Sequence, residues 1–201
     1  MDPTAQLYYA TAAFLATHYV SSTPLRAALV KGLGEKAYLG VYSLAAFATL
    51  GWMIWAYGKA PPEPVFQGLR LAPAILMPFA FVLIACGLLA RNPTAVGADK
   101  LLRSPEAARG MIRVTRHPMM WGLMLWSLAH LLARGEHMAS VFFGGFLVLA
   151  ALGALLIDQR KARTLGEDWQ RFAAVTSYIP FGAILQGKNR FDAREIGWRN
   201  P

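Results

Sequence analysis

The sequence predicts an all-α protein, a polytopic membrane helix bundle with about five transmembrane helices and short interfacial helices. Hydrophobic residues make up 56% of the 201 positions and charged residues 15%, with a mean hydropathy of +0.37. Soluble domains are usually about 25% charged. Five stretches contain no Asp, Glu, Lys or Arg: residues 5–21, 37–57, 71–90, 118–133 and 138–157. A spanning helix needs roughly 20 mostly apolar residues, so these runs are the expected spans, the first and fourth being short. We treat residues 1–201 as a single membrane domain.

The segments around and between the apolar runs predict further elements. No Lys or Arg precedes the first apolar run, so residues 5–21 are expected to be a span and not a cleaved signal peptide. Pro24 ends this span, and leucines at helical spacing predict a short interfacial helix before Gly34. Residues 91–117 form an amphipathic loop that is expected on the membrane surface. Residues 158–176 have helical periodicity and predict an interfacial tail helix with Trp169 as its anchor.

The basic residues are distributed unevenly along the chain. Residues 21–36, 91–117 and 158–201 hold 17 of the 20 Lys and Arg, and with five spans these segments share one face. Lys and Arg mark cytoplasmic loops, which places the N-terminus outside and the C-terminus inside a membrane, expected to be the bacterial inner membrane. The net charge of +9 is therefore interpreted as attraction to anionic lipid headgroups. A nucleic-acid partner is not expected, because no aromatic and basic stripe accompanies the charge.

Four histidines are candidate functional residues: His18, His117, His130 and His137. Ionisable residues inside a membrane are costly and indicate function. His18 and His130 lie within apolar runs, His117 precedes a helix start at Pro118, and His137 is expected to be solvated. Two imidazoles from different helices are a typical ligand pair for a haem iron. Without a CxxCH motif such a haem would be non-covalent, of the b type. Hydrogen bonding across helices is the alternative role.

Helix geometry limits which histidines could share an iron. His117 and His130 are thirteen residues apart, about 20 Å along a helix, so they cannot bind one metal. His18 could pair with either of them. Simple alternation of the spans places His18 and His117 near the same membrane face, whereas pairing with His130 requires a shift in depth. Spacing alone leaves both pairs open.

Three blocks of sequence resemble the NnrU family of integral membrane proteins, which includes a haem-dependent 15-cis-zeta-carotene isomerase. The blocks are FLATHYVSSTPLRAALVKGLGEKAYLGVYSL (14–44), GMIRVTRHPMMWGLMLWSLAHLL (110–132) and DQRKARTLGEDWQRFAAVTSYIPFGAI (158–184). The resemblance implies haem b with His18 and His130 as its iron ligands. It also implies cis-trans isomerisation of an apolar polyene. A family cysteine three residues before the second histidine is replaced by Ser127 here, which argues against a thiolate ligand.

The resemblance also suggests groups that would hold the anionic parts of a cofactor. Arg26, Arg113 and Arg116 are expected partners for haem propionates, because guanidinium groups bind carboxylates in a bidentate manner. His117, next to Arg116, belongs to the same cofactor-binding set. Ordinary positive charge at the cytoplasmic edge is the alternative interpretation of these arginines.

Two other functions fit parts of the same sequence. Family members linked to nitrite and nitric oxide metabolism imply a non-catalytic haem or electron-transfer accessory protein in denitrification. The stretch RHPMMWG is similar to the RHPxYxG motif of membrane methyltransferases, which implies S-adenosylmethionine as an alternative cofactor. Met120 replaces the motif's tyrosine, and Asp158-Gln159 replaces a glutamate pair of those enzymes.

Overall fold

The structure, a computed structural model, describes residues 2–95, 97–104 and 106–196. Within these ranges it is helical and contains no β-strand, which confirms the all-α prediction. The elements in chain order are α1 (Pro3–Val20), α2 (Leu25–Leu33), α3 (Glu35–Lys59), α4 (Ala72–Leu89), the 3-10 helix η1 (Asp99–Arg103), α5 (Met111–Val114), α6 (Pro118–Arg134), α7 (His137–Val175), α8 (Gly182–Leu185) and the 3-10 helix η2 (Ala193–Glu195).

Each of the five uncharged runs overlaps a helix, α1, α3, α4, α6 or α7, and extends beyond it by at most one residue at either end. Among the described residues, α3, α4 and α7 are long and apolar enough to cross a membrane. The membrane helix bundle is thus supported by three helices, and the count of five spans is not confirmed. α6 is only 17 residues long, as expected from its short apolar run.

Local sequence explains where several helices begin and end. The Asp2 side chain accepts a hydrogen bond from the Ala5 amide at 3.0 Å and so caps α1, with Pro3 as the first helical residue. α2 is the predicted short helix, and it ends at Gly34, whose φ of 81° suits glycine. α6 begins at Pro118, directly after His117, as the sequence predicts.

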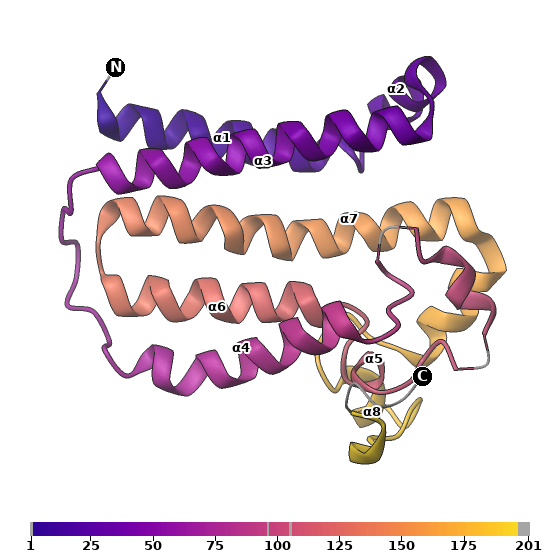
Figure 1. Ribbon diagram of the computed structural model, residues 1–201. Coiled ribbons are helices and arrows are strands. Elements are labelled where there is room, and N and C mark those ends of the chain that lie inside the picture. Colours follow the sequence, from indigo (N-terminus) through magenta and orange to yellow (C-terminus); the bar gives the residue numbers. More distant parts are fainter. Residues whose placement is uncertain (1, 96, 105, 197–201) are drawn as a thin grey trace. The chain divides into compact units, whose positions relative to one another are not determined.

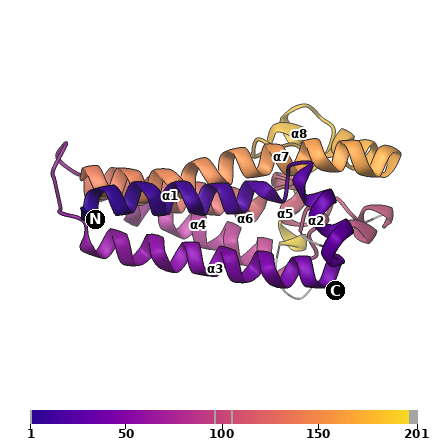
Figure 2. The same ribbon diagram turned by 90° about the horizontal axis from the view of Figure 1, so that it is seen from above.

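The chain divides into two compact units. Unit 1 comprises the residues up to Pro73 together with Ser127–Leu149. In it α1 and α3 run side by side in opposite directions, as Figures 1 and 2 both show. α1 also packs against α7, where the Tyr19 hydroxyl donates to the Val148 carbonyl at 2.9 Å. His18 and His130 both belong to this unit.

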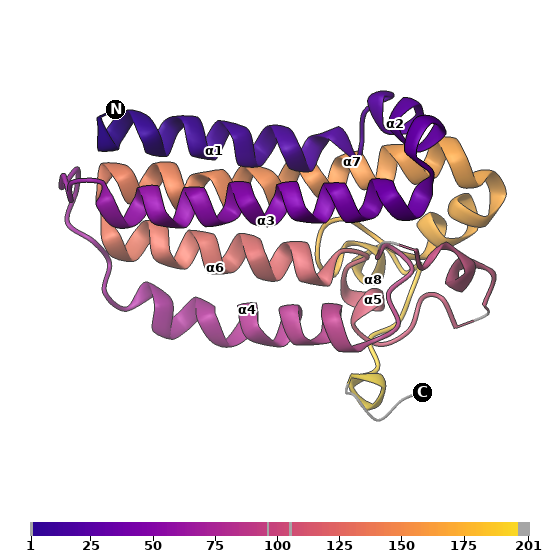
Figure 3. The ribbon, with the colours of Figure 1, turned by 45° about the horizontal axis from the view of Figure 1, so that its top comes forward.

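Unit 2 comprises Ala74–Trp126 and the residues from Ala150 onward. Here α4 lies beside the first half of α6 (Figure 3). The two backbones approach closely at Gly122, where an added Cβ would stand 2.8 Å from the Ala80 carbonyl oxygen. The second half of α7, the loop before α6 and the C-terminal segment complete this unit.

The tail differs from the sequence prediction in two respects. Residues 158–175 are helical but continue α7, and the helix breaks only at Gly166, where φ is 50°. No proline or glycine lies between Asp158 and Leu165 to stop the helix earlier. Trp169 is 4% exposed and packs in a core with Leu102, Ile112 and Phe172. The prediction that Trp169 is the interfacial anchor of the tail helix is therefore wrong, because apolar side chains of the preceding loop cover it.

Candidate functional site

The predicted iron ligands, His18 on α1 and His130 on α6, both belong to unit 1 and are half-buried. His18 packs against Phe14 with ring centroids 4.3 Å apart. His130 stacks on Phe143 at 4.7 Å with an interplanar angle of 23°. A chain of ring contacts connects the two histidines, through Phe14, Phe146, Phe142 and Phe143, with centroid distances of 5.0 to 5.3 Å between successive phenylalanines. The surroundings of both imidazoles are thus aromatic and apolar.

The hydrogen bond made by His18 determines its tautomer. The Nδ1 atom lies 2.8 Å from the backbone carbonyl oxygen of Phe14. A carbonyl oxygen only accepts, so Nδ1 carries the hydrogen and Nε2 keeps its lone pair. Histidines that bind metals usually donate their other ring N–H in this way. In its neutral form the His18 ring therefore has the tautomer that a ligand needs.

Arg26, at the start of α2 in unit 1, already has a carboxylate partner. Its Nη2 atom donates to Glu35 Oε1 at 2.6 Å, and its guanidinium lies 5.5 Å from the centre of the Tyr38 ring. The pair is partly exposed, with side-chain exposures of 30% and 53%. Exposed ion pairs are weak, about 0–1 kcal/mol, so Arg26 could exchange Glu35 for another anion at small cost.

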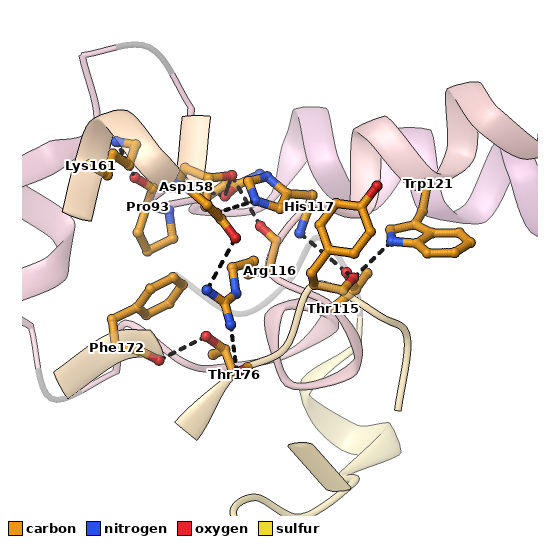
Figure 4. Close-up of polar contacts among 12 residues, drawn as sticks. Pro93, Thr115, Arg116, His117, Trp121, Asp158, Lys161, Phe172 and Thr176 are labelled. Carbon is orange, nitrogen blue, oxygen red and sulfur yellow. Dashed lines mark hydrogen bonds and ion pairs between the residues drawn. The ribbon is translucent and has the colours of Figure 1, made fainter. Parts of the chain in front are cut away.

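Unit 2 contains a polar cluster built on Asp158 of α7 (Figure 4). His117 Nε2 lies 2.6 Å from Asp158 Oδ1, and Arg116 Nη1 donates to Asp158 Oδ2 at 3.2 Å. Because an ionised carboxylate accepts only, His117 Nε2 carries the hydrogen. The His117 side chain is 1% exposed and that of Arg116 13%. One carboxylate therefore binds the two residues that precede α6.

Backbone carbonyl groups accept further hydrogen bonds from this cluster. Arg116 Nη2 donates to the Thr176 carbonyl oxygen at 2.9 Å, and the guanidinium lies 5.6 Å from the Trp169 ring centre. Thr115 Oγ1 and Trp121 Nε1 both donate to the Tyr178 carbonyl oxygen at 2.8 Å. Burial lowers the pKa of Arg116, while the nearby Asp158 carboxylate raises it. Removing one partner of a buried ion pair usually costs about 3–5 kcal/mol, so this cluster has a structural role.

The Asp158 cluster lies where two of the uncharged runs end. His117 immediately precedes the uncharged run of α6, and Asp158 immediately follows that of α7. Just beyond it, Lys161 is 2% exposed, donates to the Pro93 carbonyl oxygen at 3.0 Å and pairs with Asp99. The cluster therefore marks the level at which apolar helix surface gives way to charged loops.

Arg113 holds the C-terminal segment of unit 2. Its Nε and Nη2 atoms donate to the two oxygens of Glu195 at 2.6 and 3.0 Å, and its Nη1 donates to Asn189 Oδ1 at 2.6 Å. The Gly110 amide also donates to Glu195, at 2.9 Å. These hydrogen bonds, mainly that from Arg113, lower the pKa of Glu195 from 4.5 to about 2. Arg113 binds a carboxylate in the bidentate manner expected for a propionate, but here the carboxylate is Glu195.

The structure thus divides the predicted site residues between two units. His18, His130 and Arg26 lie in unit 1, and Arg116, His117 and Arg113 lie in unit 2. Sequence reasoning missed the carboxylate partners of all three arginines, which are Glu35, Asp158 and Glu195. For Asp158 a signal existed, since it is the first charge after a long apolar run. Whether the predicted residues bind haem stays a prediction.

These features define a class of protein: an all-helical, membrane-associated protein with two histidines in an aromatic environment and a buried ionic cluster at the end of its apolar helices. The family model described as NnrU protein matches residues 6–195. The chain belongs to the NnrU family, as its three sequence blocks predict.

Two curated proteins resemble part of the chain. It is 40% identical over 79 residues to the 15-cis-zeta-carotene isomerase, chloroplastic, of Arabidopsis thaliana, which covers 39% of this chain. It is 36% identical over 81 residues to the protein of the same name from Zea mays, which covers 40% of this chain. The aligned part spans 22% of the length of each relative. No solved structure matches the chain.

Proposed function

We propose that this chain is a haem-dependent cis-trans isomerase acting on a double bond of an apolar polyene. The NnrU membership and the names of the two relatives support an isomerase-like role. The structural observation that carries the proposal is the hydrogen bond from His18 Nδ1 to the Phe14 carbonyl oxygen, at 2.8 Å, which leaves Nε2 with a lone pair for iron.

Unit 1 contains the two imidazoles, of His18 and His130, that would bind the iron of a b-type haem. In this structure four phenylalanine rings connect them, so binding both to one iron requires those rings to move aside. Both histidine rings pack against phenylalanine, so the surroundings of the two imidazoles are apolar, as those of a haem are. The propionates would need cationic partners, and Arg26 in the same unit has only a weakly held, exposed partner in Glu35.

The residues of unit 1 also suit the reaction. Haem would supply an iron that exchanges electron density with the double bond, which lowers the barrier to rotation. Rotation about a double bond transfers no proton, so this route uses no general acid or base. Phe14, Phe142 and Phe143 are buried, so the interior beside the two histidines is apolar and excludes water, as a polyene substrate requires. The hydrogen bond to the Phe14 carbonyl oxygen fixes the orientation of the His18 imidazole.

The competing methyltransferase function has less support. Arg116 and His117 would be needed to hold S-adenosylmethionine in the resembling enzymes. Here both side chains are bound to Asp158 within the protein interior. Their hydrogen-bonding groups are used to connect α6 with α7, which favours a structural role.

The first test is the visible spectrum of the purified protein, expressed with added haem precursor. We expect a Soret band that is lost in His18→Ala and in His130→Ala. His137→Ala is the matched control, because His137 is exposed and bonds to Tyr8 at the surface. If the band persists without His130 and disappears in His117→Ala, the ligand assignment is wrong. A colourless protein refutes the haem proposal.

The second test measures the reaction in a bacterial strain that accumulates 15-cis-zeta-carotene. Chromatography should show loss of the 15-cis isomer with the wild type and not with His18→Ala. A protein that binds haem without changing the isomer pattern would be the non-catalytic haem protein instead. Calorimetric binding of S-adenosylmethionine would favour the methyltransferase.

A further inference from the structure

Four exposed apolar side chains lie between residues 179 and 191 of unit 2, outside its long apolar helices. Ile179 is 64% exposed, Phe181 47%, Leu185 84% and Phe191 52%. The rings of Phe181 and Phe191 lie within 6.4 Å of each other, centroid to centroid. Single exposed apolar residues are ordinary, but a patch of this kind indicates a surface that binds something apolar.

The backbone holds this segment in a defined conformation. Phe181 has a φ of 62°, in the left-handed region that bulky residues rarely adopt. Its amide donates to the Val114 carbonyl oxygen at 2.8 Å. Arg113 binds Asn189 and Glu195, on either side of Phe191. The aromatic side chains are therefore presented outward by a built structure.

Hydrogen bonds also determine the level of the segment relative to α6. The Arg116 amide donates to the Ser177 carbonyl oxygen at 2.9 Å, and Thr115 Oγ1 donates to that of Tyr178. Both donors lie just before Pro118, where the uncharged run of α6 begins. The segment is thus attached at the boundary between apolar helix and charged loop. In a membrane protein this boundary is the headgroup region, where aromatic side chains are favoured.

The polar residues of the segment complement a negatively charged surface. Lys188 and Arg190 are exposed, and in the described part of the chain neither forms an ion pair. The Asp192 side chain accepts a hydrogen bond from the Arg194 amide, so it binds within its own segment. Among the described residues, two cations outside any ion pair therefore lie within the apolar segment, between Leu185 and Phe191.

We propose that residues 179–191 form an interfacial anchor that binds the surface of an anionic lipid bilayer. Phe181, Leu185 and Phe191 enter the boundary between headgroups and acyl chains, and Lys188 and Arg190 bind headgroup phosphates. This anchor does not depend on haem or on isomerase activity. It assigns a lipid contact to a segment too short to span the membrane.

The test places an environment-sensitive fluorophore at Leu185→Cys in a Cys86→Ala background, because Cys86 is the only cysteine in the sequence. The matched control carries the probe at Lys100→Cys, an exposed position in the charged loop of the same unit. Each protein is reconstituted in vesicles of phosphatidylcholine, or of phosphatidylcholine with an equal amount of phosphatidylglycerol. Quenching by doxyl-labelled lipid is compared with quenching by aqueous iodide.

We expect lipid quenching to dominate at position 185 and iodide quenching at position 100. Anionic lipid should increase lipid quenching at position 185, and Lys188→Gln with Arg190→Gln should reduce this increase, by up to about fivefold in the partition equilibrium for each charge removed. Raising the salt from about 0.1 M to about 1 M should act in the same direction, because it shortens the Debye length from about 10 Å to about 3 Å. Strong iodide quenching at position 185 would overturn the proposal. Protection from both quenchers would overturn it too, since it would show that protein covers the patch.

Discussion

Glu195→Gln should release the C-terminal segment from Arg113. The substitution keeps the size of the side chain and removes its charge. The fall in the pKa of Glu195 from 4.5 to about 2 corresponds to about 3 kcal/mol of preferential stabilisation of the ionised form, at 1.36 kcal/mol per unit. The Glu195 side chain is 14% exposed, so solvent screens this interaction only in part. Since the segment lies near the end of the described chain, the loss should appear as local opening rather than global unfolding.

The assay is hydrogen exchange at the Gly110 amide, which donates to Glu195. Exchange in Glu195→Gln should accelerate on the order of a hundredfold at neutral pH. The matched control is Glu106→Gln, whose exposed pair with Arg109 should contribute little. The depressed pKa means that the stabilisation is complete above pH 4.5 in the wild type and is lost as the pH falls toward 2. Equal protection in Glu195→Gln and wild type, or loss of wild-type protection between pH 7 and 5, would refute this reasoning.

Two further predictions concern the packing of unit 2. Asp158→Asn should lower the free energy of unfolding, measured by chemical denaturation, by about 3 kcal/mol, because it leaves Arg116 buried without its counter-charge. The control Asp168→Asn removes a carboxylate from a more exposed ion pair and should lower the same free energy by less than about 1 kcal/mol. Gly122→Ala should destabilise the protein in a thermal melt by forcing α4 and α6 apart, whereas Gly144→Ala, which meets no atom within 4 Å, should be neutral or stabilising. Equal effects within either pair of variants would contradict the packing described.

The helices could be predicted from sequence because each depends on a local property, a run of residues without charge. The start of α6 at Pro118 and the end of α2 at Gly34 follow from single residues with restricted or permissive backbones. The burial of Trp169 was not predicted, because helical periodicity identifies the apolar face of a helix but not the side chains that pack against it. The loop residue Leu102, far away in the sequence, covers that face.

The site was predictable only in part, for a similar reason. His18 and His130 stand out as ionisable residues in apolar runs. The partners of Arg113 and Arg116 do not, since Glu195 and Asp158 lie 82 and 42 residues further along the chain. Local pattern therefore identifies which side chains carry charge, whereas tertiary packing decides which carboxylate each one binds.

If the apolar helices enter a bilayer, the Asp158 cluster has a consequence for how they do so. Arg116 and His117 precede α6, and their counter-charge follows the apolar part of α7, with only Gly135 and Glu136 between the two helices. If α6 inserted alone, Arg116 and His117 at its start would lie at the lipid boundary without a carboxylate partner. If α6 and α7 inserted together, Asp158 would already neutralise this charge. The two helices are thus suited to insertion as one helical hairpin, closed by the ion pair at its open end.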